Sequence, residues 1–319
     1  FDYWGFESLG QKTVMMDDLG AIASFAASRS SSPTSNGPMM NHLLDKLTNG
    51  RNSLGQSIMI AKVLNTQSND NDATYMLMGD PLLNVVPPVR DSLMTVSGQT
   101  AQGDTLHARD LAIVSGSFAS SPVSGTFEIK AFNTKREYDL GWHTFVTQRG
   151  APLFSGSATV TGGAYQTEFI VPDDVTPGNN GFIVSYVWDP AQKQDYTSYH
   201  HPLALSDDAV TAENPDAPEI NLYIGSYDFR PGDTVGTNTT LYARISDSNG
   251  INVTGSFGHN IMLFLDNSLQ PAPVTDYFIY DLDSYTTGIL TFPLTGLSEG
   301  SHTLQLIAFD NFNLPAVAS

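Results

Sequence analysis

Apolar residues recur at helical spacing in two stretches near the start of the chain. In PMMNHLLDKLTNG, residues 38–50, the apolar positions fall on one face of a helix: Met39, Met40, Leu43, Leu44 and Leu47. Asn49-Gly50 follows the last turn, where glycine commonly ends a helix. SLGQSIMIAKVL, residues 53–64, predicts a second helix, in which Ser53 is the N-cap and Gln56 completes a capping box.

Short apolar runs on either side of these helices predict strands. LGAIASFAASR, residues 19–29, is rich in small apolar residues, and TYMLMGDPLLNVV, residues 74–86, is broken by Gly79-Asp80-Pro81. Continuous apolar runs of this length are typical of strands that are buried on both faces. Strands that alternate with helices indicate a sheet with helices on its faces, so we predict that residues 1–88 are α/β.

After Pro87-Pro88 the pattern changes to short alternating runs separated by turn residues, with no convincing helix. Runs such as GTFEIKAFN and GFIVSYVWD predict a first β-sandwich over residues 89–209. The polar stretch TAENPDAPE, residues 211–219, predicts a linker at the start of the next domain. Residues 210–319 predict a second sandwich, and their length suits one immunoglobulin-like unit. The expected fold class is therefore multidomain, α/β plus all-β.

Composition excludes several classes of function. The 319 residues carry 14 Lys+Arg against 33 Asp+Glu, a net charge of -19, which repels nucleic acid and anionic membrane surfaces. No apolar run is long enough for membrane insertion. The chain has no cysteine, which excludes disulfides, zinc–thiolate sites and a thiol nucleophile within these residues.

The stretch GINVTGSFGHNIMLFLD, residues 250–266, offers candidate chemistry between two expected strands. We favour a structural interpretation, in which the ring of His259 hydrogen-bonds loop carbonyls and fixes the turn. The alternative is a cation site, with oxygen ligands from Asp247, Asn249 and Asp266. A structural calcium is the ion expected there, and no other cofactor is expected. The acids Asp276, Asp281 and Asp283 are interpreted as a solvated face, with a calcium loop as the alternative.

Several phrases of the chain occur in a distinctive order: ESLGQ, NSLGQSIMIAK, YMLMGDPLL, FSGSATVTGGAYQTEFIVPDDV and GINVTGSFGHNIMLFLD. In this order they resemble the C-terminal portion of the type IX secretion system sortase family, which are gingipain-type cysteine peptidases. The resemblance covers nearly the whole chain. It implies the C-terminal part of a caspase-like α/β domain, followed by two immunoglobulin-like β-sandwiches.

The resemblance also implies an activity. Members of the family cleave C-terminal secretion signals with a catalytic Cys–His pair and attach the cargo to the cell surface. The implied partners are substrates that carry such signals and other components of the secretion system. The implied location is extracellular, at the bacterial outer-membrane surface. Both catalytic residues are expected upstream of Phe1, so no catalytic residue is assigned and this chain alone is expected to be inactive.

The loop SRSSSPTSNG, residues 28–37, leaves an expected strand of the α/β part and is expected to border the substrate cleft. Its candidate substrate-binding residues are Arg29, Ser31 and Asn36, with an ordinary solvated loop as the alternative. A second function remains open, namely a cell-surface scaffold or adhesin without catalysis. The first 88 residues discriminate between the two, because a free-standing adhesin needs no part of a peptidase sheet.

Overall fold

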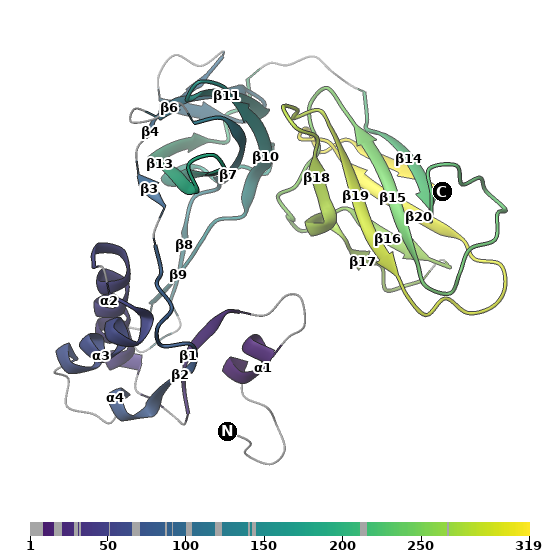
Figure 1. The fold of residues 1–319 in the computed structure, drawn as a ribbon. Coiled ribbons are helices and arrows are strands. Elements are labelled where there is room, and N and C mark those ends of the chain that lie inside the picture. The colour runs from purple at the N-terminus through teal and green to yellow at the C-terminus, as the bar shows by residue number, and fades with distance from the viewer. Residues whose placement is uncertain are drawn as a thin grey trace. The chain divides into compact units, whose positions relative to one another are not determined.

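The chain forms two compact units, Phe1–Pro88 and Val89–Ser319, which are described separately (Figure 1). Among the described residues, more lie in β-strands than in helices, and the α-helices belong to the first unit. The computed structural model describes residues 9–15, 21–28, 31, 33–50, 52–65, 71–86, 88–90, 92–99, 104–118, 123–139, 141, 145–210, 216–266 and 268–319. No helix within these ranges is both long and apolar enough to cross a membrane.

The first unit is a small α/β layer. Strands β1 (Ala23–Ala27) and β2 (Tyr75–Gly79) pair antiparallel, with Phe25 opposite Leu77. The helices are α1 (Leu9–Met15), α2 (Pro33–Asn49), α3 (Leu54–Leu64) and α4 (Asn71–Thr74). The predicted strands and helices of residues 1–88 are thus present.

Helices pack on both faces of the β1–β2 pair. On one face, buried residues of α2 and α3 such as Leu43 and Ile58 pack against Phe25. On the other face, a Cβ on Gly10 of α1 would lie 2.7 Å from the Cβ of Ala26. Glycine is therefore the residue that lets α1 approach the strand so closely.

Two details of this unit differ from the prediction. The strands are only partly buried rather than buried on both faces, because each has one strand neighbour among the described residues. Helix α2 begins at Pro33 and includes Pro38, so much of the predicted loop 28–37 is helical. The capping box of α3 is confirmed, since Ser53 Oγ accepts from the Gln56 N–H and Gln56 Oε1 accepts from the Ser53 N–H.

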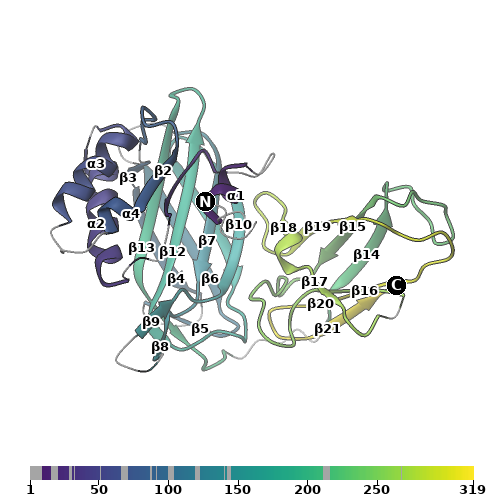
Figure 2. The same ribbon diagram turned by 90° about the horizontal axis from the view of Figure 1, so that it is seen from below.

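The part of the second unit up to residue 210 contains two main sheets. The larger has the order β10-β7-β12-β13-β3, with β5 also paired to β13, and the smaller has the order β11-β6-β4. Figure 2 shows β12 and β13 as the longest strands of this part. A hairpin, β8–β9, extends from it. The bounds are β3 Val89–Arg90, β4 Ser92–Gly98, β5 Thr105–His107, β6 Leu111–Phe118, β7 Gly125–Phe132, β8 Arg136–Asp139, β9 Phe145–Gln148, β10 Pro152–Val160, β11 Ala164–Ile170, β12 Gly178–Asp189 and β13 Gln194–Ser206.

The remaining residues form two four-stranded sheets, with the orders β14-β15-β19-β18 and β17-β16-β20-β21. In both parts of this unit, burial alternates along the strands, as in β7, where Phe127 and Ile129 are buried and Glu128 is exposed. Each sheet thus turns one face to an apolar core. The bounds are β14 Glu219–Ile224, β15 Thr239–Ser246, β16 Met262–Leu265, β17 Ala272–Pro273, η1 Thr275–Tyr277, β18 Phe278–Tyr280, β19 Thr287–Leu294, β20 Leu304–Phe309 and β21 Pro315–Ala318. We refer below to the sheets of residues 89–210 and of residues 216–319 as the first and the second β-part.

Candidate functional site

The candidate substrate-binding residues lie near the end of β1. The amide Nδ2 of Asn36 donates to Ser31 Oγ at 3.4 Å, and Ser31 Oγ lies 3.5 Å from the hydroxyl of Tyr75. The structure therefore brings Ser31 and Asn36 together beside the first residue of β2. Arg29 lies outside the described residues. Whether this polar group binds a substrate stays a prediction.

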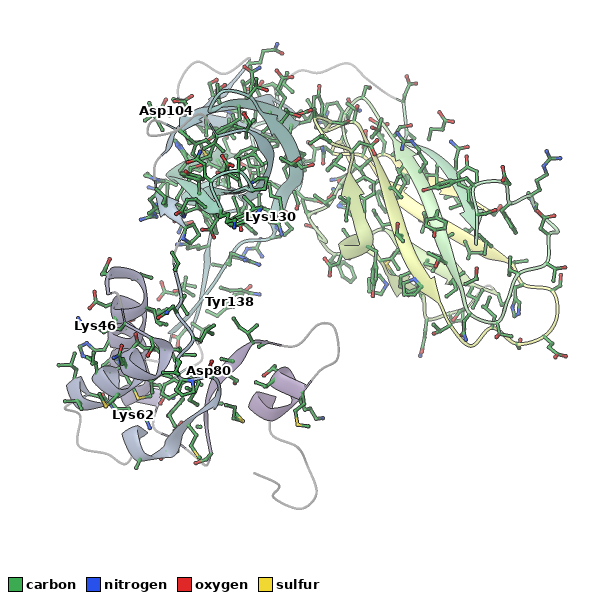
Figure 3. All side chains as sticks on the ribbon, viewed as in Figure 1. Lys46, Lys62, Asp80, Asp104, Lys130 and Tyr138 are labelled. Carbon is green, nitrogen blue, oxygen red and sulfur yellow. The ribbon has the colours of Figure 1, made fainter. Side chains whose placement is uncertain are left out.

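The carbonyl of the same tyrosine has a cationic partner. Nζ of Lys62, labelled in Figure 3, donates to the backbone oxygen of Tyr75 at 2.7 Å and lies 5.9 Å from the centre of the Phe25 ring. Lys62 is thereby held at the end of the pair where β1 ends and β2 begins. A positive charge fixed at this end of the strands suits a peptide carboxylate or carbonyl.

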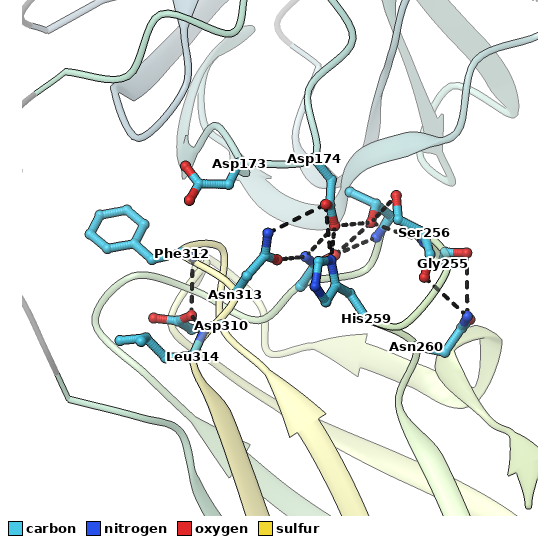
Figure 4. Close-up of polar contacts among 12 residues, drawn as sticks. Asp173, Asp174, Gly255, Ser256, His259, Asn260, Asp310, Phe312, Asn313 and Leu314 are labelled. Carbon is cyan, nitrogen blue, oxygen red and sulfur yellow. Dashed lines mark hydrogen bonds and ion pairs between the residues drawn. The ribbon is translucent and has the colours of Figure 1, made fainter.

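The sequence predicted that the ring of His259 hydrogen-bonds carbonyls of its own loop. The structure gives it a different partner. Its Nδ1 lies 3.0 Å from both carboxylate oxygens of Asp174, which belongs to the first β-part (Figure 4). An ionised carboxylate only accepts hydrogen bonds, so Nδ1 carries the proton. The ring also packs against Phe309, with 5.1 Å between ring centres. The loop 250–260 thus joins two domains instead of only turning between strands.

Three further side chains of the second β-part converge on the same carboxylate. Asn252 Nδ2 donates to Asp174 at 2.8 Å, Thr254 Oγ1 at 3.0 Å, and Asn313 Nδ2 at 3.3 Å. Burial alone would raise the pKa of Asp174. The hydrogen bonds from Asn252, His259 and Thr254 and the charge of His259 outweigh burial, and the pKa lies below its ordinary value.

The neighbouring residue makes a second connection. The N–H of Asp173 donates to the backbone oxygen of Asn311 at 2.8 Å. The carboxylate of Asp173 accepts two hydrogen bonds from Arg109, at 2.8 and 2.7 Å, and this guanidinium lies 4.9 Å from the centre of the Phe312 ring. The bidentate ion pair and its stacking therefore hold the turn 310–314 against the first β-part.

A third connection uses an acid that the sequence placed on a solvated face. The carboxylate of Asp283 accepts from the N–H and the hydroxyl of Thr159, both at 2.6 Å, and the Asp283 N–H donates to the oxygen of Ser157 at 2.9 Å. Asp283 has φ of 60°, the left-handed region, so the turn is bent to reach β10. Asp283 is exposed, as the solvated-face interpretation expects, and in addition it contacts β10.

The expected cation ligands belong to two separate hydrogen-bond groups. Asp266 accepts from Nδ1 of His302 at 2.8 Å and from the N–H of Thr303 at 2.9 Å. Asp247 accepts from the N–H of Asn249 at 2.6 Å, and Nδ2 of Asn249 donates to the buried Asp310 at 2.8 Å. Among the described residues, no three His, Asp or Glu side chains form a group that could hold a metal ion. Calcium binding by Asp247, Asn249 and Asp266 stays a prediction.

The buried acids Asp247 and Asp310 have unusual titration. Burial raises the pKa of Asp247 to about 6, and the charge of Asp310 adds to the effect, while the hydrogen bond from the Asn249 N–H opposes it. Burial also raises the pKa of Asp310. Burial thus shifts both acids toward the protonated form, and Asn249 lies between them in the hydrogen-bond group.

The Asp174–His259 pair has the contact that orients histidine in catalytic triads, so a hydrolytic role must be weighed. Such a role needs a hydroxyl bonded to the other ring nitrogen. Within the described residues, the nearby Thr254 hydroxyl donates to Asp174 and lies 3.1 Å from Ser256 Oγ, and no hydroxyl bonds to Nε2 of His259. The described contacts of this pair join the two β-parts.

Comparisons with known proteins find a family similarity for the first unit. Residues 1–86 match the model of peptidase family C25. We call these residues the C25 segment. No curated protein matches the chain.

A solved structure, dimeric latent PorU from Porphyromonas gingivalis, is similar over more than the C25 segment. The two chains are 24% identical with a TM-score of 0.43, and the match covers 84% of this chain but 27% of that one. The chain thus spans about a quarter of the length of that protein. The C25 segment contains Ser31, Asn36 and Lys62, whereas the Asp174 contacts lie outside it.

Sequence reasoning missed Asp173, Asp174 and Asp310 as positioning residues. Asp173 and Asp174 were visible in the phrase IVPDDV, and the phrase GINVTGSFGH, which contains three partners of Asp174, was visible too. Their mutual contact joins positions 85 residues apart, and no periodicity within either phrase encodes such a pairing.

Proposed function

We propose that this chain is a segment of a cysteine peptidase that acts as a sortase of the type IX secretion system. In this proposal the intact protein cleaves C-terminal secretion signals and attaches the cargo to the outer-membrane surface, outside the cell. The observation that carries the proposal is the C25 match over residues 1–86. The order of the phrases in the rest of the chain supports the sortase assignment.

The chemistry of a cysteine peptidase requires a thiolate that attacks the peptide carbonyl and a histidine that lowers the thiol pKa and protonates the leaving amine. This chain has no cysteine, so the thiolate must come from residues outside it. In the proposal, the C25 segment contributes the polar group at Ser31 and Asn36, together with Arg29, to the lining of the substrate cleft.

The β-parts have a supporting role in this proposal. The contacts of Asp173, Asp174 and Asp283 join them through charged hydrogen bonds, which favours a rigid arm over two independently moving domains. A rigid arm suits docking to other components of the secretion system, and we include that docking in the proposal. Caspase-like and immunoglobulin-like remain the expected assignments for the α/β unit and the two β-parts.

The test compares this chain with the longer polypeptide that contains it and any upstream residues. Both are incubated with a cargo protein that ends in a C-terminal secretion signal, and cleavage is followed by mass spectrometry. We expect the longer polypeptide to cleave the cargo and iodoacetamide to block it, while this chain alone leaves the cargo intact. Cleavage by neither, together with retained binding to the secretion machinery, would favour the non-catalytic scaffold.

A second measurement addresses the cleft. Alanine in place of Ser31 or Asn36 in the longer polypeptide is expected to raise KM for the signal, with Thr48→Ala as a control on the exposed side of α2. Unchanged kinetics would remove both residues from the substrate site.

A further inference from the structure

A row of aromatic rings crosses the outward face of the larger sheet in the first β-part. Phe132 of β7 stacks on Phe182 of β12 with 4.7 Å between ring centres, Phe182 lies 5.8 Å from Tyr199 of β13, and Tyr199 lies 5.7 Å from the His201 ring. These residues alternate with core residues such as Ile183, so their side chains leave the sheet on the side away from the core. Tyr199 is 44% exposed, whereas Phe132 and Phe182 are only 4% and 8% exposed, so an incoming partner meets Tyr199 and the cations rather than these two rings.

A cation lies over each of the first three rings. The guanidinium of Arg149 is 4.5 Å from the centre of Phe132, Nζ of Lys135 is 5.5 Å from Phe182, and the guanidinium of Arg90 is 5.8 Å from Tyr199. Each of these distances is within the range of a cation–π contact. The three cations come from β3, the β7–β8 connection and the residue after β9, so only the fold gathers them.

These cations keep their charge available. Among the described residues, the ion pairs to carboxylates involve Lys46, Arg109, Arg244, His259 and His302, and none of the three. In a chain with 33 acids and 14 Lys+Arg, three basic residues gathered on one sheet face are the opposite of the general charge pattern. The ring covers one face of each guanidinium, so a carboxylate would bind at its N–H edges.

The surface continues along the same sheet face. Lys130, labelled in Figure 3, alternates with the buried Ile129 and Ala131 and therefore adds a fourth cation on the side of Phe132. Farther along β12, Tyr186 is 40% and Trp188 is 46% exposed. Tyr, Trp and Arg are the residue types that dominate binding energy at protein interfaces. We call these residues the cation–aromatic surface: Arg90, Lys130, Phe132, Lys135, Arg149, Phe182, Tyr186, Trp188, Tyr199 and His201.

We propose that the cation–aromatic surface binds a short acidic segment of a partner polypeptide. The charge complementarity is local. The net charge of -19 repels a long polyanion, because its charges reach acidic parts of the protein more than a Debye length, about 8 Å, from this surface. A few carboxylates on a short segment avoid that repulsion. Apolar side chains in the same segment pack against Tyr186 and Trp188.

Two acids on the same face argue for a polypeptide over a lipid surface. Glu128 pairs in register with Tyr186, and Asp195 pairs with Trp188. Lipid phosphates over this face would meet both carboxylates. By register, Glu128 and Tyr186 lie in one row across the sheet with Thr197 and Arg90, and the guanidinium of Arg90 extends toward Tyr199. A polypeptide can place acids at the Lys135–Arg149 end and beside the Arg90 guanidinium, and neutral side chains beside Glu128 and Asp195.

The experiment measures binding of a fluorescent peptide of alternating glutamate and leucine to this chain at physiological salt, by fluorescence anisotropy. The matched peptide with lysine in place of glutamate is the negative control. We expect the acidic peptide to bind and the variant R90Q/R149Q to weaken it at least about tenfold, because each guanidinium loses a charge-assisted contact. The variant R90K/R149K should keep most of the affinity.

The matched control variant is K12Q/R230Q, which removes the same charge from exposed positions elsewhere. Equal weakening in the control and in R90Q/R149Q would overturn the proposal, because binding would follow net charge alone. Preferential binding of heparin or of anionic phosphatidylglycerol vesicles over the acidic peptide would overturn it as well. Circular dichroism of both variants establishes that they are folded. Because the anisotropy experiment measures binding alone, its outcome does not depend on the proposed peptidase activity.

Discussion

Nδ1 of His259 donates to the Asp174 carboxylate at 3.0 Å across 85 positions of sequence. Asn252, Thr254 and Asn313 donate to the same group. Four donors from two segments, the loop 250–260 and the turn 310–314, thus converge on one acceptor, and these contacts fix the second β-part against the first. This geometry explains why the polar side chains of Asn252 and Thr254 are buried.

Replacing Asp174 with asparagine should destabilise the chain. The variant keeps the shape but presents an amide N–H to donors that need an acceptor, so hydrogen bonds from Asn252 and Thr254 cannot all be kept. We expect a loss of about 1–3 kcal/mol in the free energy of unfolding, measured by urea titration. Asp228→Asn, an exposed acid, is the matched control. Equal stability of the two variants would contradict the structural role of Asp174.

The contribution of Asp174 should depend on pH. Its pKa is lowered in the folded state, so its stabilising effect is present above the unfolded-state pKa of about 3.9 and is lost as the pH falls through the lower folded pKa. The stability difference between the parent and Asp174→Asn should therefore be constant near neutral pH and shrink in strong acid. Urea titrations across this range check it, and a difference that shrinks at neutral pH would point to another group.

Asp247 should show the opposite sign. Its pKa is raised to about 6 in the folded state, so its contribution is most favourable below the unfolded pKa and is lost as the pH rises from about 4 to 6. Asp247→Asn should thus be more stable than the parent at pH 7, on the order of 1 kcal/mol, and equal to it in acid. Thermal melting at both pH values measures this. A rise of the parent Tm with calcium, absent in the variant, would instead assign the carboxylate to a cation.

Tyr280 should be among the most sensitive residues of the second β-part. Its fully buried hydroxyl donates to the oxygen of Ile251 and accepts from the N–H of Ile251, both at 2.7 Å. Tyr280→Phe leaves both backbone groups buried without that partner, and we expect a loss of about 2–4 kcal/mol in unfolding free energy. Tyr227→Phe, on an exposed ring, is the control. If Tyr280→Phe lowered the unfolding free energy as little as Tyr227→Phe does, water would be replacing the Tyr280 hydroxyl.

Local patterns were sufficient for much of the secondary structure. The capping box at Ser53 was predicted correctly because its two hydrogen bonds join residues three apart. Helix α2 was predicted to begin at Pro38 but begins at Pro33. Proline is tolerated near a helix start, so Pro33 can begin the helix. The earlier start was missed because the polar residues before Pro38 carry no apolar stripe. Burial of β1 was overestimated, since an apolar run does not say how many neighbours a strand has.

By itself, the sequence determined the succession of an α/β part and β-strand parts, the excess of acid and the lack of a thiol, because these depend on residue type and on spacing over a few positions. The tertiary structure decided the rest. In the structure, His259 contacts Asp174 instead of its own loop. Asp266 and Asp247 belong to separate hydrogen-bond groups. Arg90, Lys135 and Arg149 lie over a row of aromatic rings. Each of these pairings joins distant segments, and its free energy depends on burial and register that no local pattern records.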